Sequence, residues 1–165
     1  MKLESSAVRL WKRLDGEERL AAAAAFWRQP SEEVVGTALS AIAKARRMRP
    51  QAVRSLDEAA RARALAGILD PGEPLAASLL VSLHLGERRH LLRAFLDGAG
   101  LQHADGILPE EENDAPVPVS AEQARAGVAA LADVPRREVS LYLNALWLQD
   151  PDRWGSLAGL ELPEE

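Results

Sequence analysis

Three histidines and a short run of charged residues are the groups in this chain best suited to chemistry. His84 precedes the run Glu87-Arg88-Arg89-His90, and His103 stands two positions before Asp105. Imidazole and carboxylate groups bind metal ions or transfer protons, and arginines at a helix start favour anions. The candidate residues for binding a ligand or anion are therefore Arg88, Arg89, His90, His84, His103 and Asp105.

The spacing of the histidines argues against a metal site. On one continuous helix, the side chains of His84 and His90 would point about 120° away from each other. A break at Gly86 would be needed to bring them together, with His103 and Asp105 as further ligands. The HExxH pattern of metal-binding helices is absent. We therefore predict neither a metal ion nor a cofactor.

Sequence motifs for nucleophilic or nucleotide chemistry are absent as well. The chain has no GxSxG, no P-loop and no glycine-rich dinucleotide-binding pattern. Its paired glutamates, such as Glu17-Glu18, stand where a helix start favours negative charge. The sequence leans against an enzyme and gives no catalytic residue. A small enzyme or a metal site using the histidines around 84–105 is kept as the second alternative.

A second cluster of charge raises the question of nucleic acid. Phosphate contacts need positive charge gathered on one face, although helix C-termini favour lysine and arginine in any case. The net charge of −5 argues against a protein built to coat nucleic acid, so such a partner is not our first expectation. A regulator that binds nucleic acid or an anion is the first alternative. Its candidate residues are Lys44, Arg46, Arg47, Arg49 and Arg54.

The elements that must position these groups are helices. Alanine, leucine and arginine dominate the chain, and these residues have high helix propensity. Asp15, Ser31, Ser55 and Ser120 stand where a side chain caps a helix start, Ser55 and Ser120 as capping boxes. We predict an all-α fold, an irregular antiparallel bundle of about eight or nine helices. Around Asp105-Gly106, a tiny β-hairpin within 101–108 and an irregular loop both remain open.

The length predicts a single domain over residues 1–165. Residues 109–119 read PEEENDAPVPV, an acidic, proline-rich composition typical of a linker. This linker would join the helices of residues 1–100 to a C-terminal helical hairpin at 120–157.

Two predicted helices, residues 75–85 and 139–148, are apolar nearly all round. Such a helix is buried in its own domain or contributes to an interface between subunits. We therefore predict that these helices form the core and that the chain associates with itself as a homodimer or with another protein. The leading hypothesis is a non-enzymatic helical interaction or regulatory module.

Cysteine is absent, which excludes disulfides and thiolate chemistry. No export signal and no apolar stretch of membrane-spanning length is evident. We expect a cytoplasmic protein without a membrane partner. The excess of arginine over lysine indicates GC-rich coding, and we expect a bacterial source.

Overall fold

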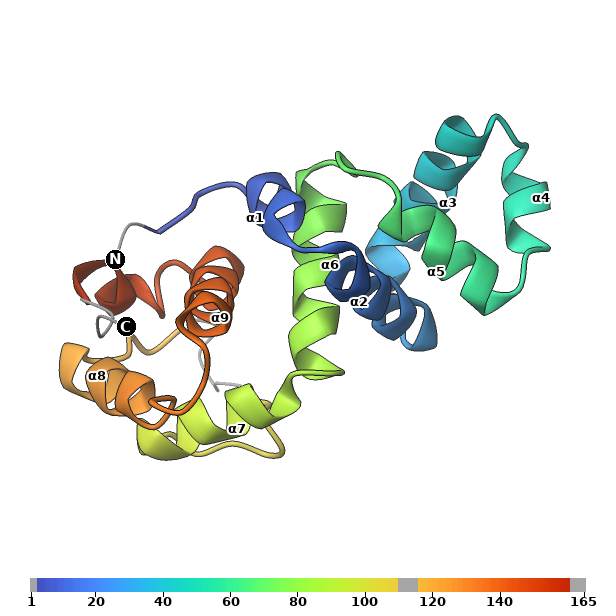
Figure 1. Cartoon of the computed structure of the whole chain (residues 1–165). Coiled ribbons are helices and arrows are strands. Elements are labelled where there is room, and N and C mark those ends of the chain that lie inside the picture. Colours follow the sequence, from blue (N-terminus) through green and yellow to red (C-terminus); the bar gives the residue numbers. More distant parts are fainter. Residues whose placement is uncertain (1–2, 110–115, 161–165) are drawn as a thin grey trace. The chain divides into compact units, whose positions relative to one another are not determined.

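The computed structural model describes residues 3–109 and 116–160. Within these ranges the chain forms nine α-helices, one short 3₁₀ helix and a single isolated β-bridge (Figure 1). The prediction of an all-α fold is confirmed. No helix in the described part of the chain is both long and apolar enough to cross a membrane.

The helices group into two compact units, each described here by itself. The N-terminal unit is Ser6–Glu87, and the C-terminal unit combines Met1–Ser5 with Arg88–Glu165. The division falls before the seventh helix and not at the predicted linker. Residues 110–115 of that linker lie outside the described residues. The assignment of the whole chain to one domain stays a prediction.

The N-terminal unit holds six helices whose starts follow local capping rules in part. Asp15 forms a capping box with Glu18, as its position predicts. Ser31 occupies the cap position of its helix without a side-chain hydrogen bond. The capping box predicted at Ser55 is wrong, because Asp57 caps that helix instead. The helices are α1 (Ala7–Arg13), α2 (Gly16–Arg28), α3 (Glu32–Arg46), α4 (Pro50–Arg54), α5 (Glu58–Ala66) and α6 (Glu73–Leu85).

Helix α6 carries much of the core of this unit, as its apolar sequence predicts. Helices α1, α2 and α3 pack against it, and α5 packs on α2. Burying one leucine side chain contributes about 1.5–3 kcal/mol, so the buried leucines of α6 anchor the unit. They are Leu75, Leu79, Leu80 and Leu83.

The C-terminal unit contains α7 (Arg89–Gly98), α8 (Ala121–Ala129), α9 (Arg136–Gln149) and the 3₁₀ helix η1 (Gly155–Gly159). Helices α7 and α8 approach so closely that a Cβ atom on Gly127 would lie 2.7 Å from the ring of Phe95. Phe95 in turn packs on Tyr142 and Trp154, with ring centroids 5.5 and 5.8 Å away. Glycine at 127 therefore allows α8 to rest on an aromatic core.

Helix α9 contributes a run of buried residues to the core of this unit, at Val139 and from Leu141 to Ala145. One polar residue, Asn144, lies among the buried apolar residues of this helix and is 1% exposed. The amide of Asn144 donates to the carbonyl of Ser140 at 2.6 Å and accepts from the backbone N–H of Glu4 at 2.5 Å. A buried amide needs such partners, and they attach the N-terminal segment to α9.

Candidate functional site

The turn at residues 104–107 is a minimal β-hairpin. The backbones of Ala104 and Ile107 exchange hydrogen bonds of 2.8 and 3.0 Å. Asp105 and Gly106 between them have φ angles of 53° and 88°. Two left-handed central residues define a type I′ turn, for which Asp-Gly is a favoured pair. The hairpin alternative is therefore the one the structure adopts, reduced to a single bridge.

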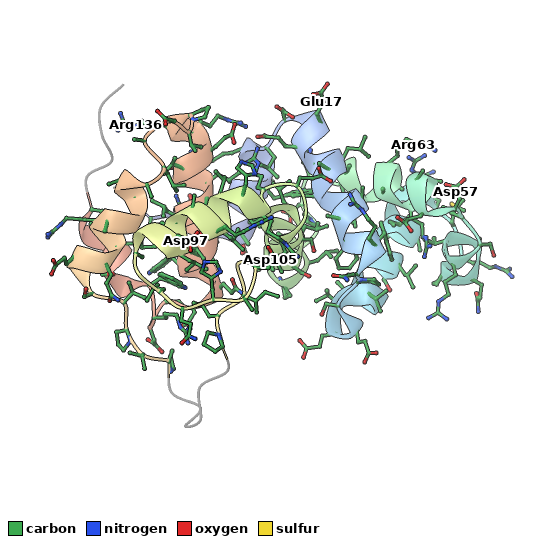
Figure 2. All side chains as sticks on the ribbon, turned by 90° about the horizontal axis from the view of Figure 1, so that it is seen from below. Glu17, Asp57, Arg63, Asp97, Asp105 and Arg136 are labelled. Carbon is green, nitrogen blue, oxygen red and sulfur yellow. The ribbon has the colours of Figure 1, made fainter. Side chains whose placement is uncertain are left out.

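Ion pairs fasten this turn to α7 through Asp105, which Figure 2 labels. Oδ2 of Asp105 accepts a hydrogen bond from Nη1 of Arg89 at 2.6 Å, and Oδ1 lies 3.0 Å from Nε of Arg93. Arg89 and Arg93 are four positions apart, so they share one face of α7. The hydrogen bond from Arg89, aided by the charge of Arg93, lowers the pKa of Asp105.

His103 connects the same turn to α7 by a second set of hydrogen bonds. Its Nδ1 accepts the backbone N–H of Gly106 at 3.0 Å, and its Nε2 lies 3.0 Å from Oδ1 of Asp97. Because Nδ1 is the acceptor, the neutral ring carries its proton on Nε2 and donates it to Asp97. The His103 side chain is 10% exposed.

The pairing of a carboxylate with an imidazole resembles the orienting half of a catalytic dyad. In such a dyad the second ring nitrogen must be open to take a proton from the nucleophile or substrate. In His103 that nitrogen is occupied by the Gly106 N–H, and using it as a base would break the turn. The arrangement therefore holds a loop on a helix.

Arg89, His103 and Asp105 were among the predicted ligand residues. Asp97 and Arg93, which complete the arrangement, were not. The spacing of Arg93 and Asp97 from Arg89 is the sequence feature that could have identified both residues. Residues 89, 93 and 97 repeat every four positions, so they line one face of α7 beside the turn.

The other predicted ligand residues lie elsewhere. Arg88 precedes α7, and His90 is exposed in its first turn. His84 belongs to the N-terminal unit, where it is 4% exposed and its Nδ1 donates to the carbonyl of Leu80 at 2.8 Å. His84 and His103 thus belong to different units, and a site shared by them stays a prediction. Among residues 3–109 and 116–160, no three His, Asp or Glu side chains are placed to hold a metal ion.

The second set of candidates lies on two neighbouring helices of the N-terminal unit and the turn between them. We call Lys44, Arg46, Arg47, Arg49 and Arg54 the basic corner. All five are exposed, at the end of α3, in the following turn and in α4. In the described part of the chain none of their side chains has an ion pair or hydrogen bond.

Comparison with known proteins gives no relative. No family model, no curated protein and no solved structure matches the chain.

Proposed function

We propose that this chain is a non-enzymatic helical interaction module that associates with itself. The observation that supports a non-catalytic role is the commitment of the best chemical groups to structure. Both ring nitrogens of His103 and both carboxylate oxygens of Asp105 have partners within the chain. These bonds hold the imidazole and the carboxylate in the turn, where both groups stabilise the fold.

Support for self-association comes from the C-terminal end of α9. Leu146, Trp147 and Leu148 are consecutive and only partly buried there, whereas Leu141 and Leu143 earlier in the helix are buried. Tryptophan is enriched in the cores of protein interfaces and among the residues that contribute most to binding. Covering these side chains with a second copy would remove apolar surface from water.

The test is the oligomeric state of the full chain. Light scattering after size exclusion, over a range of protein concentrations, is expected to give a dimer for the wild type and a monomer for Trp147→Lys. Leu69→Lys changes an equally apolar side chain, 54% exposed in the N-terminal unit, and is expected to stay dimeric. A wild type that is monomeric at every concentration would contradict the proposal. Circular dichroism checks that each variant remains folded.

We also propose the cytoplasm as the location, because a chain without cysteine gains nothing from an oxidising compartment. Fractionation of cells that produce the tagged chain tests this placement, and recovery in a membrane or secreted fraction would overturn it.

A further inference from the structure

The basic corner is a concentration of positive charge in an acidic protein. Residues 34–56 contain its five cations and no aspartate or glutamate, whereas the whole chain has a net charge of −5. The carboxylates that make the whole chain acidic therefore all lie outside this segment. A cluster of this kind raises the local concentration of anions.

The fold presents these side chains outward. Helix α4 packs on α3, and Val53, which is 0% exposed, faces inward from α4. Within the N-terminal unit, α4 lies at the end away from α6 (Figure 1). Asp57, the next acidic residue along the chain, has its Oδ1 bonded to the backbone N–H of Ala60. Its carboxylate is used to cap α5.

One residue of the basic corner, Arg47, has a backbone conformation that residues other than glycine rarely adopt. Arg47 ends α3 with a left-handed φ of 52°, and the N–H of Met48 returns to the carbonyl of Ala43 at 2.9 Å. Glycine is the usual residue at this position of the helix end, because it has no Cβ to clash. A guanidinium stands here instead, which adds one more charge to the corner.

We propose that the basic corner binds the phosphate backbone of duplex nucleic acid without reading its sequence. Four of its five cations are arginine, whose planar guanidinium bonds phosphate oxygens in pairs. Contacts to phosphate need only positive charge and hydrogen-bond donors, and the lysine and arginines of the basic corner supply both. This inference goes beyond self-association and does not rest on it.

Two observations select this ligand over its competitors. An acidic protein partner would need apolar or aromatic anchors beside the charges, and residues 44–56 expose no large apolar side chain. Single strands are bound by stacking their bases on aromatic rings. No Phe, Tyr or Trp occurs between Trp27 and Phe95. A duplex, with its bases stacked internally, fits a surface of charge alone.

The expected signature is a steep dependence on salt. Each phosphate contact contributes about −0.9 to the slope of log K against log salt, so five contacts give about −4.5. Raising salt from about 50 to about 200 mM would then weaken binding about 500-fold. Affinity should differ little between duplexes of different sequence.

The experiment measures fluorescence anisotropy of labelled duplex DNA of about 24 base pairs, titrated with the full chain across this salt range. The variant Arg46→Gln/Arg49→Gln leaves three cations, so its slope should fall to about −2.7 and its loss of affinity to about 40-fold. The matched control is Arg125→Gln/Arg136→Gln, which removes two exposed charges from α8 and α9 (Figure 2 labels Arg136). The control should keep the slope of the wild type.

Further probes identify the source of the phosphates. A duplex RNA that binds with the same slope supports backbone recognition common to both duplexes, and one that does not bind assigns the site to DNA. Tighter binding of single strands overturns the preference for a duplex. Binding of polyglutamate without binding of any duplex overturns the proposal in favour of an acidic protein. No binding at low salt, or equal slopes for the variant and the wild type, also overturns it.

Discussion

The arginines of α7 and those of the basic corner both place positive charge at the surface, but they differ in their partners. Arg89 and Arg93 each have a contact with the carboxylate of Asp105 at 3.0 Å or less. The side chains of Arg46 and Arg49 have no such partner in the described chain. A basic cluster is therefore a binding candidate only where the fold leaves its side chains without carboxylate partners in the chain.

The largest effect on the turn that holds Asp105 against α7 is expected from Gly106→Ala. Gly106 has a φ of 88°, and a Cβ atom there would lie 3.1 Å from Cβ of Leu92. The strained backbone and the contact with α7 should together lower the free energy of unfolding by about 2 kcal/mol. Urea denaturation measures the loss. A turn lifted from α7 would also separate Asp105 from its arginines.

The control for this change is Gly159→Ala in the same unit. An added Cβ at position 159 meets nothing within 4 Å, and its φ is not left-handed. We expect a change below about 0.5 kcal/mol. Equal losses in both variants would show that the turn is not the cause.

Arg47→Gly tests the basic corner through both its stability and its charge. Relieving the left-handed backbone should raise the free energy of unfolding by about 1 kcal/mol. The same change removes one cation, so the salt slope for duplex DNA should become shallower by about 0.9. Thermal denaturation and anisotropy measure the two effects. Arg46→Gln removes a neighbouring charge without backbone relief and should leave stability within about 0.5 kcal/mol of the wild type.

If Arg47→Gly stabilised the chain and left the slope unchanged, Arg47 would lie outside the surface that meets phosphate. Loss of stability would instead mean that the guanidinium itself supports the fold.

The smallest expected effect on stability comes from Asp105→Asn, because the ion pairs it removes are exposed. The arginines lower the pKa of Asp105 in the folded chain below its ordinary 3.8. Its stabilising contribution is therefore complete well above that value and is lost as the pH falls through the lowered pKa. Urea denaturation should show the wild type more stable than Asp105→Asn at pH 7, with the gap closing in acid. Asp152→Asn, at an exposed aspartate, should show no gap. A gap that does not change with pH would exclude the carboxylate charge as its cause.

Local signals predicted well what local contacts decide. The cap at Asp15 and the capping box at Ser120 need only the next three residues, and both form; Asp15 also makes a capping box with Glu18. Ser55 failed because it closes the end of α4, where its hydroxyl donates to the carbonyl of Gln51 at 3.1 Å. That left Asp57 to begin α5. Two caps competed within three positions, and propensity alone could not rank them.

The contact between the turn and α7 could not be predicted from the sequence, for a different reason. Arg89 and Asp105 are separated by a helix end and a loop, and many loop paths would keep them apart. The pattern at 89, 93 and 97 indicated a face but not what covers it. The buried amide oxygen of Asn144 likewise has its hydrogen-bond donor at Glu4, 140 positions away. Long-range partners of polar groups decide such sites, and one sequence does not specify them.

The bond between Glu4 and Asn144 also bears on how the chain is made. Ribosomes synthesise from the N-terminus, so Glu4 emerges long before Asn144 exists to receive it. The C-terminal unit can close only after Asn144 has been synthesised, and it then recruits a segment that was made 140 positions earlier. A fragment expressed from residue 88 onward would lack this segment and would leave the Asn144 oxygen without the Glu4 N–H.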